Sequence, residues 1–511
     1  MKDMRNDEDG VNVLVGLALV VGITVLLAGT LYTMTIGMGG GGDACYAPSV
    51  PDYLYDGGRL PQNYPIMPPQ PDYVYTAENS VSTFGADVDT GSYVYARNCL
   101  NNGMAPEPER VRTEEFLNYF DYRYPQPTEP DFTIYTESGP SYFGDDGYRM
   151  LKVGIRGRSI STESREPVTL ICVIDTSGSM ESSGKLSLIK EALPHLVGQL
   201  IEGDRFGIVT YGTTAKNYLS PVGIDEKENI LDSISKLSTE GSTNAQDGLT
   251  KGYEMALEYR MSGQQTRLLL LSDGVANTGV YDVEGLVGMI QQYKEMSIYL
   301  STYGFGMGEY NDQLMEQLAD NGDGKYGYID TLTEAKKEFV ADLTGNLNTI
   351  AKDLKLKMEF NSEIVAEYRL LGYENRLMTE EEFEDDAKDS GDIGAGHTVT
   401  ALYEFKLREG AGTGTMATLH IRYKEPETEE NRAMNIAIKA DSIIAGLEDT
   451  TPQFRFALAV AEFAEYLGGS TYCDSALKDI QRLASDALGE FNYQASEEKE
   501  FLELVGKAMG V

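Results

Sequence analysis

The residues Leu170 to Met180, LICVIDTSGSM, bring one carboxylate to the end of an apolar run and follow it with two hydroxyls at alternate positions. The carboxylate belongs to Asp175, and the hydroxyls belong to Ser177 and Ser179. Carboxylate and hydroxyl oxygens are hard ligands that suit Mg2+, Mn2+ or Ca2+ better than zinc. The spacing therefore predicts that these three side chains surround one face of a divalent metal ion.

Two more oxygen-bearing side chains are expected at the same place. Asp273 ends the apolar run TRLLLLSD, and Thr243 precedes a helical pattern in GSTNAQDGL. In an open α/β sheet, ligands bind outside the carboxyl ends of the strands. The predicted metal ligands are therefore Asp175, Ser177, Ser179, Thr243 and Asp273. The alternative is that the serines only cap the helix that follows them.

The elements that would position these residues lie between 166 and 350. Four short apolar runs, TLICVID, RFGIVTY, TRLLLLSD and IYLSTYGFG, alternate with helical patterns such as KLSLIKEALPHLVGQLI. Apolar strands that alternate with amphipathic helices are typical of a parallel sheet covered on both faces. We therefore predict a doubly wound α/β domain with a mostly parallel sheet over residues 166–350.

Strands with a period of two lie on both sides of this domain. FTIYTE and YRMLKVGIRG precede it, while LKLKMEFN, TVTALYEFKL and TMATLHIRY follow it. Such alternation, with Gly-rich turns, is typical of a β-sandwich. We predict that the α/β domain is inserted between β-sandwich segments at 80–165 and 351–450. A helical region should follow at 451–511, where apolar residues recur at helical spacing at Phe456, Val460, Phe463 and Leu467.

The N-terminal segment is expected to anchor the chain in a membrane. Residues 11–38 contain no charged side chain, and 28 residues in a helix exceed the ~30 Å thickness of a hydrocarbon core. Lys2 and Arg5 precede this segment, and no further Lys or Arg occurs before Arg59. The positive-inside rule then predicts a cytoplasmic N-terminus at 1–10, a single retained signal anchor, and an extracytoplasmic location for the bulk of the chain.

Two other forms of attachment stay open. A signal peptide would be cleaved, although its apolar centre is usually only ~7 to 15 residues long. Cys45 could carry a lipid anchor, although GDAC lacks the Leu expected three residues before a lipoprotein cysteine. Residues 39–79 are rich in Gly, Pro and Tyr, which predicts a semi-rigid linker that holds the folded part away from the membrane.

Composition excludes several classes of function. Acidic residues outnumber basic ones by 81 to 42 in 511 residues, and the formal net charge of -39 argues against nucleic-acid binding. The cysteines form no CxxC pair, so zinc and redox motifs are excluded, while one long-range disulfide stays open. The four cysteines are Cys45, Cys99, Cys172 and Cys473.

Two short motifs resemble catalytic or nucleotide-binding signatures and fail on closer inspection. VDTGS, Val88 to Ser92, matches an aspartic-protease signature, but that mechanism needs two such aspartates and no second DTG or DSG occurs. SSGKLS is not a phosphate loop, because Gly178 lies one residue too far from Gly184 and Leu186 replaces the required Ser or Thr. We therefore expect neither nucleotide binding nor an enzyme.

DTSGSM resembles the DxSxS signature of von Willebrand factor type A (VWA) domains. Their metal-ion-dependent adhesion site also uses a Thr from a middle loop and an Asp after the fourth strand, which correspond here to Thr243 and Asp273. The resemblance implies that the hydroxyls of Ser177, Ser179 and Thr243 contact the ion, that Asp175 and Asp273 bind it directly or through water, and that an Asp or Glu carboxylate of a protein partner completes the coordination shell.

The flanking segments are similar to those of bacterial YfbK-like proteins. The segments that carry this similarity are VSTFGADVDTGSYVYARNCLNNG, VRTEEFLNYFDYRYP, RLLGYENR, GDIGAGHTVTALYE and FRFALAVAEFAEYLGGS. Together with the VWA signature they imply an anchored, extracytoplasmic protein of adhesion type. The alternative is a structural cell-envelope or assembly protein in which the metal only stabilises the VWA domain.

Overall fold

The computed structural model describes most of the chain from residue 72 onward. The described ranges are 72–127, 131–142, 147–161, 165–261, 263–274, 283–306, 312–490 and 496–511. All of them belong to one compact unit, Ile66–Val511. The predicted membrane segment 11–38, Cys45 and most of the predicted linker lie outside these ranges. Within them no helix is both long and apolar enough to cross a membrane, and Cys99, Cys172 and Cys473 are free thiols.

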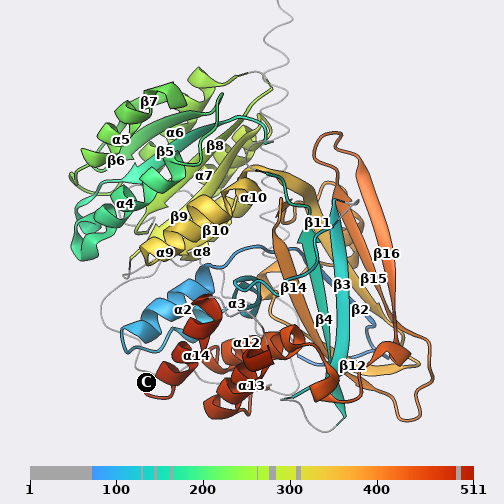
Figure 1. Cartoon of the computed structure of the whole chain (residues 1–511). Helices are drawn as coiled ribbons and strands as arrows, with labels where there is room; N and C mark the ends of the chain where they lie inside the picture. The colour runs from blue at the N-terminus through green and yellow to red at the C-terminus, as the bar shows by residue number, and fades with distance from the viewer. Residues whose placement is uncertain are drawn as a thin grey trace, which may run out of the picture. The chain divides into compact units, whose positions relative to one another are not determined.

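A six-stranded sheet in the order β10-β9-β8-β5-β6-β7 forms the centre of the α/β domain (Figure 1). All its neighbours are parallel except β6 and β7. The strands are β5 (Val168–Asp175), β6 (Arg205–Tyr211), β7 (Ala215–Gly223), β8 (Gln265–Ser272), β9 (Ile298–Phe305) and β10 (Tyr326–Ile329). Every residue of β5 and β9 is buried, as expected for strands covered on both faces.

Helices cover both faces of this sheet. Leu193 of α4 and Ile230 of α5 belong to one apolar core, while Leu249 of α6 and Ile290 of α7 belong to another. The prediction of a doubly wound α/β domain is therefore confirmed. The helices are α4 (Lys185–Val197), α5 (Lys227–Ser235), α6 (Ala245–Tyr259), α7 (Val283–Lys294), α8 (Asp312–Asn321), α9 (Leu332–Lys336) and α10 (Leu343–Leu347), with a π-helical turn at Lys337–Ala341.

Strands from both sides of the α/β domain share two further sheets. One has the order β1-β12-β14-β4-β3, and the other has the order β13-β11-β15-β16 with β2 paired to β11. The strands before the domain are β1 (Val74–Tyr75), β2 (Val81–Gly85), β3 (Phe132–Pro140) and β4 (Tyr148–Gly157). Those after it are β11 (Thr349–Phe360), β12 (Val365–Leu371), β13 (Ile393–Gly394), β14 (Thr398–Leu407), β15 (Thr415–Lys424) and β16 (Asn431–Lys439). The chain therefore leaves and re-enters the same pair of sheets around the α/β domain.

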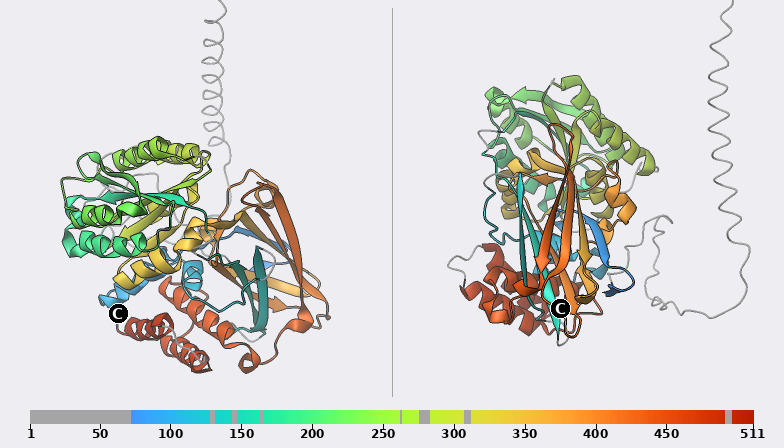
Figure 2. Two further views of the ribbon diagram at one scale, coloured as in Figure 1. Left: turned by 45° about the horizontal axis from the view of Figure 1, so that its top comes forward. Right: turned by 90° about the vertical axis from the view of Figure 1, so that its right-hand side faces the viewer.

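A layer of helices joins the two ends of the described chain. Helix α12 packs against α3 and α14 packs against α2, and the left view of Figure 2 shows the red C-terminal helices beside the blue α2. Edge-to-face aromatic contacts link Phe120 to Phe456 and Phe501, a geometry that aromatic pairs favour. These helices are α2 (Gly91–Asn101), α3 (Thr113–Asn118), α12 (Pro452–Leu467), α13 (Leu477–Glu490) and α14 (Ser496–Ala508); a short helix, α11 (Glu380–Glu384), lies beside the sandwich. The bounds assigned to the separate domains from the sequence stay predictions.

Candidate metal centre

Asp175 is the last residue of β5, and its carboxylate is held in a fixed position. One oxygen, Oδ1, accepts the backbone N–H of Ser177 at 2.8 Å, and Oδ2 accepts the hydroxyl of Ser272 at 3.0 Å. Because β5 is buried between β6 and β8, Asp175 has no solvent exposure. The pKa of Asp175 is raised to about 6, mainly by burial; the hydrogen bonds from Ser177 and Ser272 oppose the rise, and the negative charge of Asp273 adds to it.

The two serines of the first loop lie together beside this carboxylate. The Oγ atoms of Ser177 and Ser179 are 3.0 Å apart, with Ser177 buried and Ser179 exposed. The Ser177 side chain makes no capping bond to the 3-10 turn Gly178–Met180, and the residue that precedes α4 is Gly184. Helix capping therefore does not account for the serines.

The middle loop is tied to the first loop by backbone hydrogen bonds. The N–H of Gly178 donates to the carbonyl of Gly241 at 3.1 Å, and the N–H of Glu240 donates to the carbonyl of Thr176 at 2.5 Å. Thr243 follows on this loop, half-buried and directly before Asn244, the residue that caps α6. Direct hydrogen bonds thus join Asp175, Ser177 and Ser179, and backbone hydrogen bonds hold the loop of Thr243 against them.

The third loop contributes Asp273, which follows β8. Its Oδ2 lies 2.8 Å from the Nζ of Lys185, and both side chains are at least nine-tenths buried. In the sequence, Lys185 stands only in the failed phosphate-loop motif SSGKLS, so its contact with Asp273 was not predicted. Tyr211 and Ser272 were also missed, although each ends a strand, β6 or β8, at the same edge of the sheet.

The donor set fits a hard divalent cation. It combines two carboxylates with hydroxyls, and the buried phenol of Tyr211 lies beside it. The nearby charge of Asp175 contributes, after burial, to a raised pKa of Tyr211, so this phenol is neutral. Within the described part of the chain no three His, Cys, Asp or Glu side chains form a metal-holding group. The oxygen set, with only two carboxylates, is of a different kind, because hydroxyls supply its other ligands.

Three family models match most of the chain from residue 68 onward. The matching family models are "von Willebrand factor" over residues 68–150, "von Willebrand factor type A domain" over 169–346, and "Uncharacterized protein YfbK, C-terminal" over 345–511. The chain is 36% identical to "Uncharacterized protein YfbK" of Escherichia coli (strain K12) over 464 residues, which cover 85% of this chain and 79% of that protein. The chain belongs to the YfbK family.

More distant similarity is concentrated in part of the chain. "Inter-alpha-trypsin inhibitor heavy chain H1" of Bos taurus is 28% identical over 148 residues, which cover 27% of this YfbK family member and 16% of that protein. The solved structure "von Willebrand factor type A from Catenulispora acidiphila" matches with a TM-score of 0.43 at 16% identity and covers 71% of this chain and 88% of that one.

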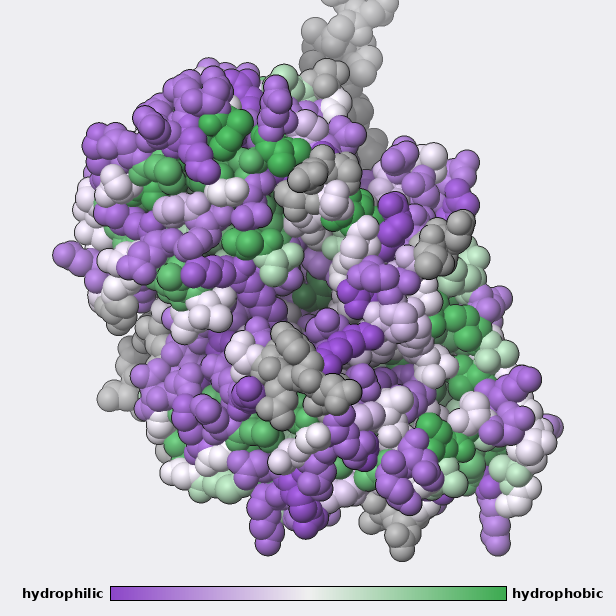
Figure 3. Space-filling model, in the orientation of Figure 1, coloured by the Kyte–Doolittle hydropathy of each residue, from purple (hydrophilic) through white to green (hydrophobic). Residues whose placement is uncertain are grey.

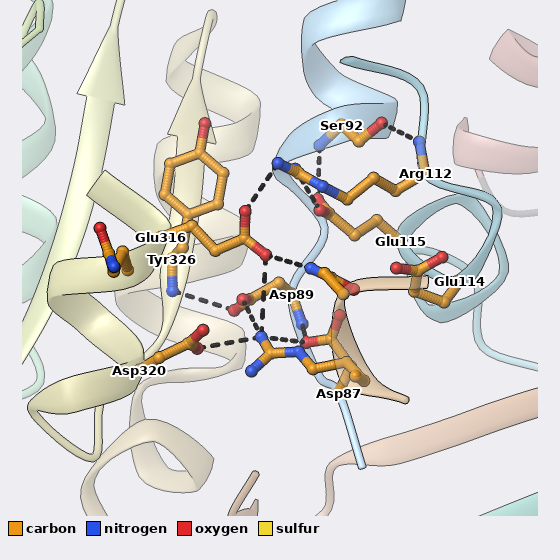
Figure 4. Close-up of polar contacts among 12 residues, drawn as sticks. Asp87, Asp89, Ser92, Arg112, Glu114, Glu115, Glu316, Asp320 and Tyr326 are labelled. Atoms are coloured by element: carbon orange, nitrogen blue, oxygen red, sulfur yellow. Dashed lines mark hydrogen bonds and ion pairs between the residues drawn. The ribbon is translucent and has the colours of Figure 1, made fainter. Parts of the chain in front are cut away.

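A second group of carboxylates in this YfbK family member, which we call the acidic junction, lies between the α/β domain and the preceding segment (Figure 4). Its six members are Asp87, Asp89, Glu114, Glu115, Glu316 and Asp320. Arg112 binds Glu115 at 2.7 Å and Glu316 at 2.6 Å. Arg376 lies 2.9 Å from Asp320, 3.2 Å from Asp89 and 3.3 Å from Asp87.

Asp89, the aspartate of the VDTGS motif, belongs to this junction. Its Oδ1 accepts the backbone N–H of Tyr326 in β10 at 2.9 Å, while Oδ2 contacts Arg376. The motif therefore connects the preceding segment to the α/β domain by a buried hydrogen bond and to the segment after that domain by an ion pair. This structural role agrees with the rejection of a protease function.

Proposed function

We propose that the VWA domain binds an acidic group of a protein partner through a divalent ion held by Asp175, Ser177, Ser179, Thr243 and Asp273. The observation that carries the proposal is the hydrogen-bonded oxygen set at one edge of the sheet, with the exposed Ser179 above the buried Asp175. Mg2+, the ion we expect, would supply a positive charge with a coordination position for the carboxylate of the partner.

The residues around the site support this role in distinct ways. The N–H of Ser177 and the hydroxyl of Ser272 orient the Asp175 carboxylate before any ion binds. Such preorganisation lowers the cost of ordering the ligands on binding. The exposure of Ser179 gives a partner access to the site, since a closed oxygen set would serve only the stability of the fold.

We also propose that the protein is anchored in a membrane through residues 11–38, with the VWA domain and the sandwich outside the cytoplasm. The uncharged length of that segment supports this location. Hydrophilic residues dominate the face drawn in Figure 3, in agreement with the net charge of -39. A strongly charged surface favours solubility, and it suits an anchored protein that projects into an aqueous space.

Capture of the partner from native membranes tests the binding function. The full-length protein should capture a partner with Mg2+ present, lose it in chelator, and lose it with Mg2+ when Asp175→Ala removes the central carboxylate. Asp225→Ala is the matched control, because Asp225 is an exposed carboxylate at the start of a different helical turn. Equal capture under all of these conditions would refute the adhesion function.

The structural alternative gives a different result in the same preparations. An ion that only stabilises the VWA domain raises the melting temperature of the protein without creating affinity for a partner. A rise in melting temperature with Mg2+, together with metal-independent capture, would favour an envelope or assembly role.

A further inference from the structure

Lys185 is a buried cation beside the proposed metal centre, and nothing in the preceding function assigns it a role. Its Nζ lies 2.8 Å from Oδ2 of Asp273, and the side chain is only 7% exposed. A buried ammonium is costly unless a carboxylate pairs with it. The pair therefore links the start of α4 to the loop after β8.

The fold accommodates the Lys185 side chain at a position where a positive charge is unfavourable. Lys185 is the first residue of α4, where the positive end of the helix dipole disfavours a cation. Its aliphatic stem crosses Gly306, which follows β9. A Cβ atom at Gly306 would lie 2.4 Å from the Cε of Lys185 and 2.8 Å from its Cδ. The chain thus leaves room for the lysine, and the pairing with Asp273 offsets the unfavourable dipole.

The charges at the site indicate what the lysine does. Asp175 and Asp273 influence each other electrostatically, and together they carry two negative charges when ionised. Lys185 compensates one of them. A bound divalent ion would then leave the site with one excess positive charge, which one carboxylate from outside would neutralise.

We propose that Lys185 is a tethered cation that weakens binding of the divalent ion alone and makes its retention depend on an acidic partner group. This inference rests on the proposed function. It makes Lys185 a residue that determines specificity: the lysine favours the complex of protein, ion and anion over the complex of protein and ion.

Titration of the full-length protein with Mg2+ alone, with and without acetate as the probe carboxylate, tests this inference. Lys185→Met removes the charge and keeps most of the stem, so we expect Mg2+ to bind at least ~10-fold more tightly and acetate to lose its enhancing effect. Lys185→Arg keeps the charge and should behave like the wild type. Lys190→Met, on the same helix but bonded to the carbonyl of Leu237, should change neither affinity. Unchanged or weaker Mg2+ binding by Lys185→Met would overturn the inference.

A measurement in chelator separates this inference from the proposed function. Without metal, Lys185→Met leaves Asp273 without its counter-charge, so the melting temperature should fall in Lys185→Met and in a second variant, Lys185→Gln, and Mg2+ should restore it. No fall in either variant would overturn the ion pair itself. If the wild type and Lys185→Met both fail to bind Mg2+, the proposed function fails and this inference with it. If both bind it equally, only the inference fails.

Discussion

The proposed metal centre and the acidic junction both gather carboxylates, yet they differ in almost every other respect. The metal centre has two carboxylates, hydroxyls from neighbouring loops and a surface-exposed serine. The acidic junction has six carboxylates around two guanidiniums, and only Asp320 is substantially exposed. Under the proposed function, the number of carboxylates does not define a metal site. What matters is whether fixed oxygens face a position that an ion and a ligand can reach.

The acidic junction cannot hold all its carboxylates in the ionised form. Two guanidiniums against six carboxylates would leave four uncompensated charges in a buried region, which is strongly unfavourable. Burial accordingly raises the pKa of Glu316 to about 8 and holds the pKa values of Asp89 and Glu114 well above their ordinary range. Two arginines, with some of the carboxylates kept protonated, therefore connect the α/β domain to the segments on either side of it.

Arg376→Met tests this connection and should have the largest effect on stability. The change removes a buried guanidinium from Asp87, Asp89 and Asp320 and leaves their charge uncompensated. We expect the free energy of unfolding, measured with urea, to fall by about 3 to 5 kcal/mol. Arg432→Met is the matched control, because its ion pair with Glu430 is exposed on both sides and should contribute no more than about 1 kcal/mol. Equal losses in the two variants would contradict the role of the junction.

The protonation of Glu316 should make the free energy of unfolding depend on pH. Its pKa is about 8 in the folded protein against an ordinary value of 4.5, because burial and the charges of Glu115 and Asp320 outweigh the two arginines. Between these values the folded state binds a proton that the unfolded state has released, so the free energy of unfolding falls as the pH rises. From pH 5 to pH 8 the fall should be roughly 2 to 4 kcal/mol.

Glu316→Gln checks the origin of this slope. The neutral side chain cannot release a proton, so urea unfolding at a series of pH values should show a flatter dependence over the same range. Glu254→Gln, at an exposed position on α6, should keep the slope of the wild type. If the free energy of unfolding of Glu316→Gln keeps the pH dependence of the wild type, the proton is bound by another carboxylate of the junction.

Local pattern was sufficient to place Asp175 and Asp273 at one edge of the sheet, because both lie at the ends of strands whose type is visible in the sequence. β5 and β8 are strands of eight residues with apolar centres, and parallel neighbours end at one edge of the sheet. The contact of Lys185 with Asp273 could not be predicted, since it depends on how α4 begins relative to a loop 88 residues away. The spacing of residues within a motif does not predict contacts between residues that are far apart in the sequence.

The acidic junction could not be predicted from the sequence for the same reason. Arg376 and Asp87 are 289 residues apart, on opposite sides of the inserted domain. Charged residues in a sequence normally indicate a solvated surface, so nothing in the pattern around Glu114 and Glu115 signalled complete burial. Only the insertion of the α/β domain between two halves of one sandwich brings these groups together.

Ser179→Ala should give the smallest change in stability and still sharpen the comparison. Ser179 is exposed, so we expect the free energy of unfolding in urea to stay within about 0.5 kcal/mol of the wild type. Its hydroxyl is one of the predicted ligands, and loss of an oxygen that contacts a charge should weaken Mg2+ binding by about tenfold or more. Calorimetric titration with Mg2+ measures the second quantity.

Ser182→Ala is the matched control, since Ser182 is also exposed and its hydroxyl donates to the carbonyl of Ser179 without belonging to the predicted ligands. Equal Mg2+ affinity in the two variants would remove Ser179 from the site. Weaker Mg2+ binding in Ser179→Ala alone, with little change in the free energy of unfolding, would distinguish the proposed metal centre from the acidic junction. At the junction, a change in charge should alter the stability of the fold, whereas at the proposed metal centre loss of the Ser179 oxygen should alter Mg2+ binding alone.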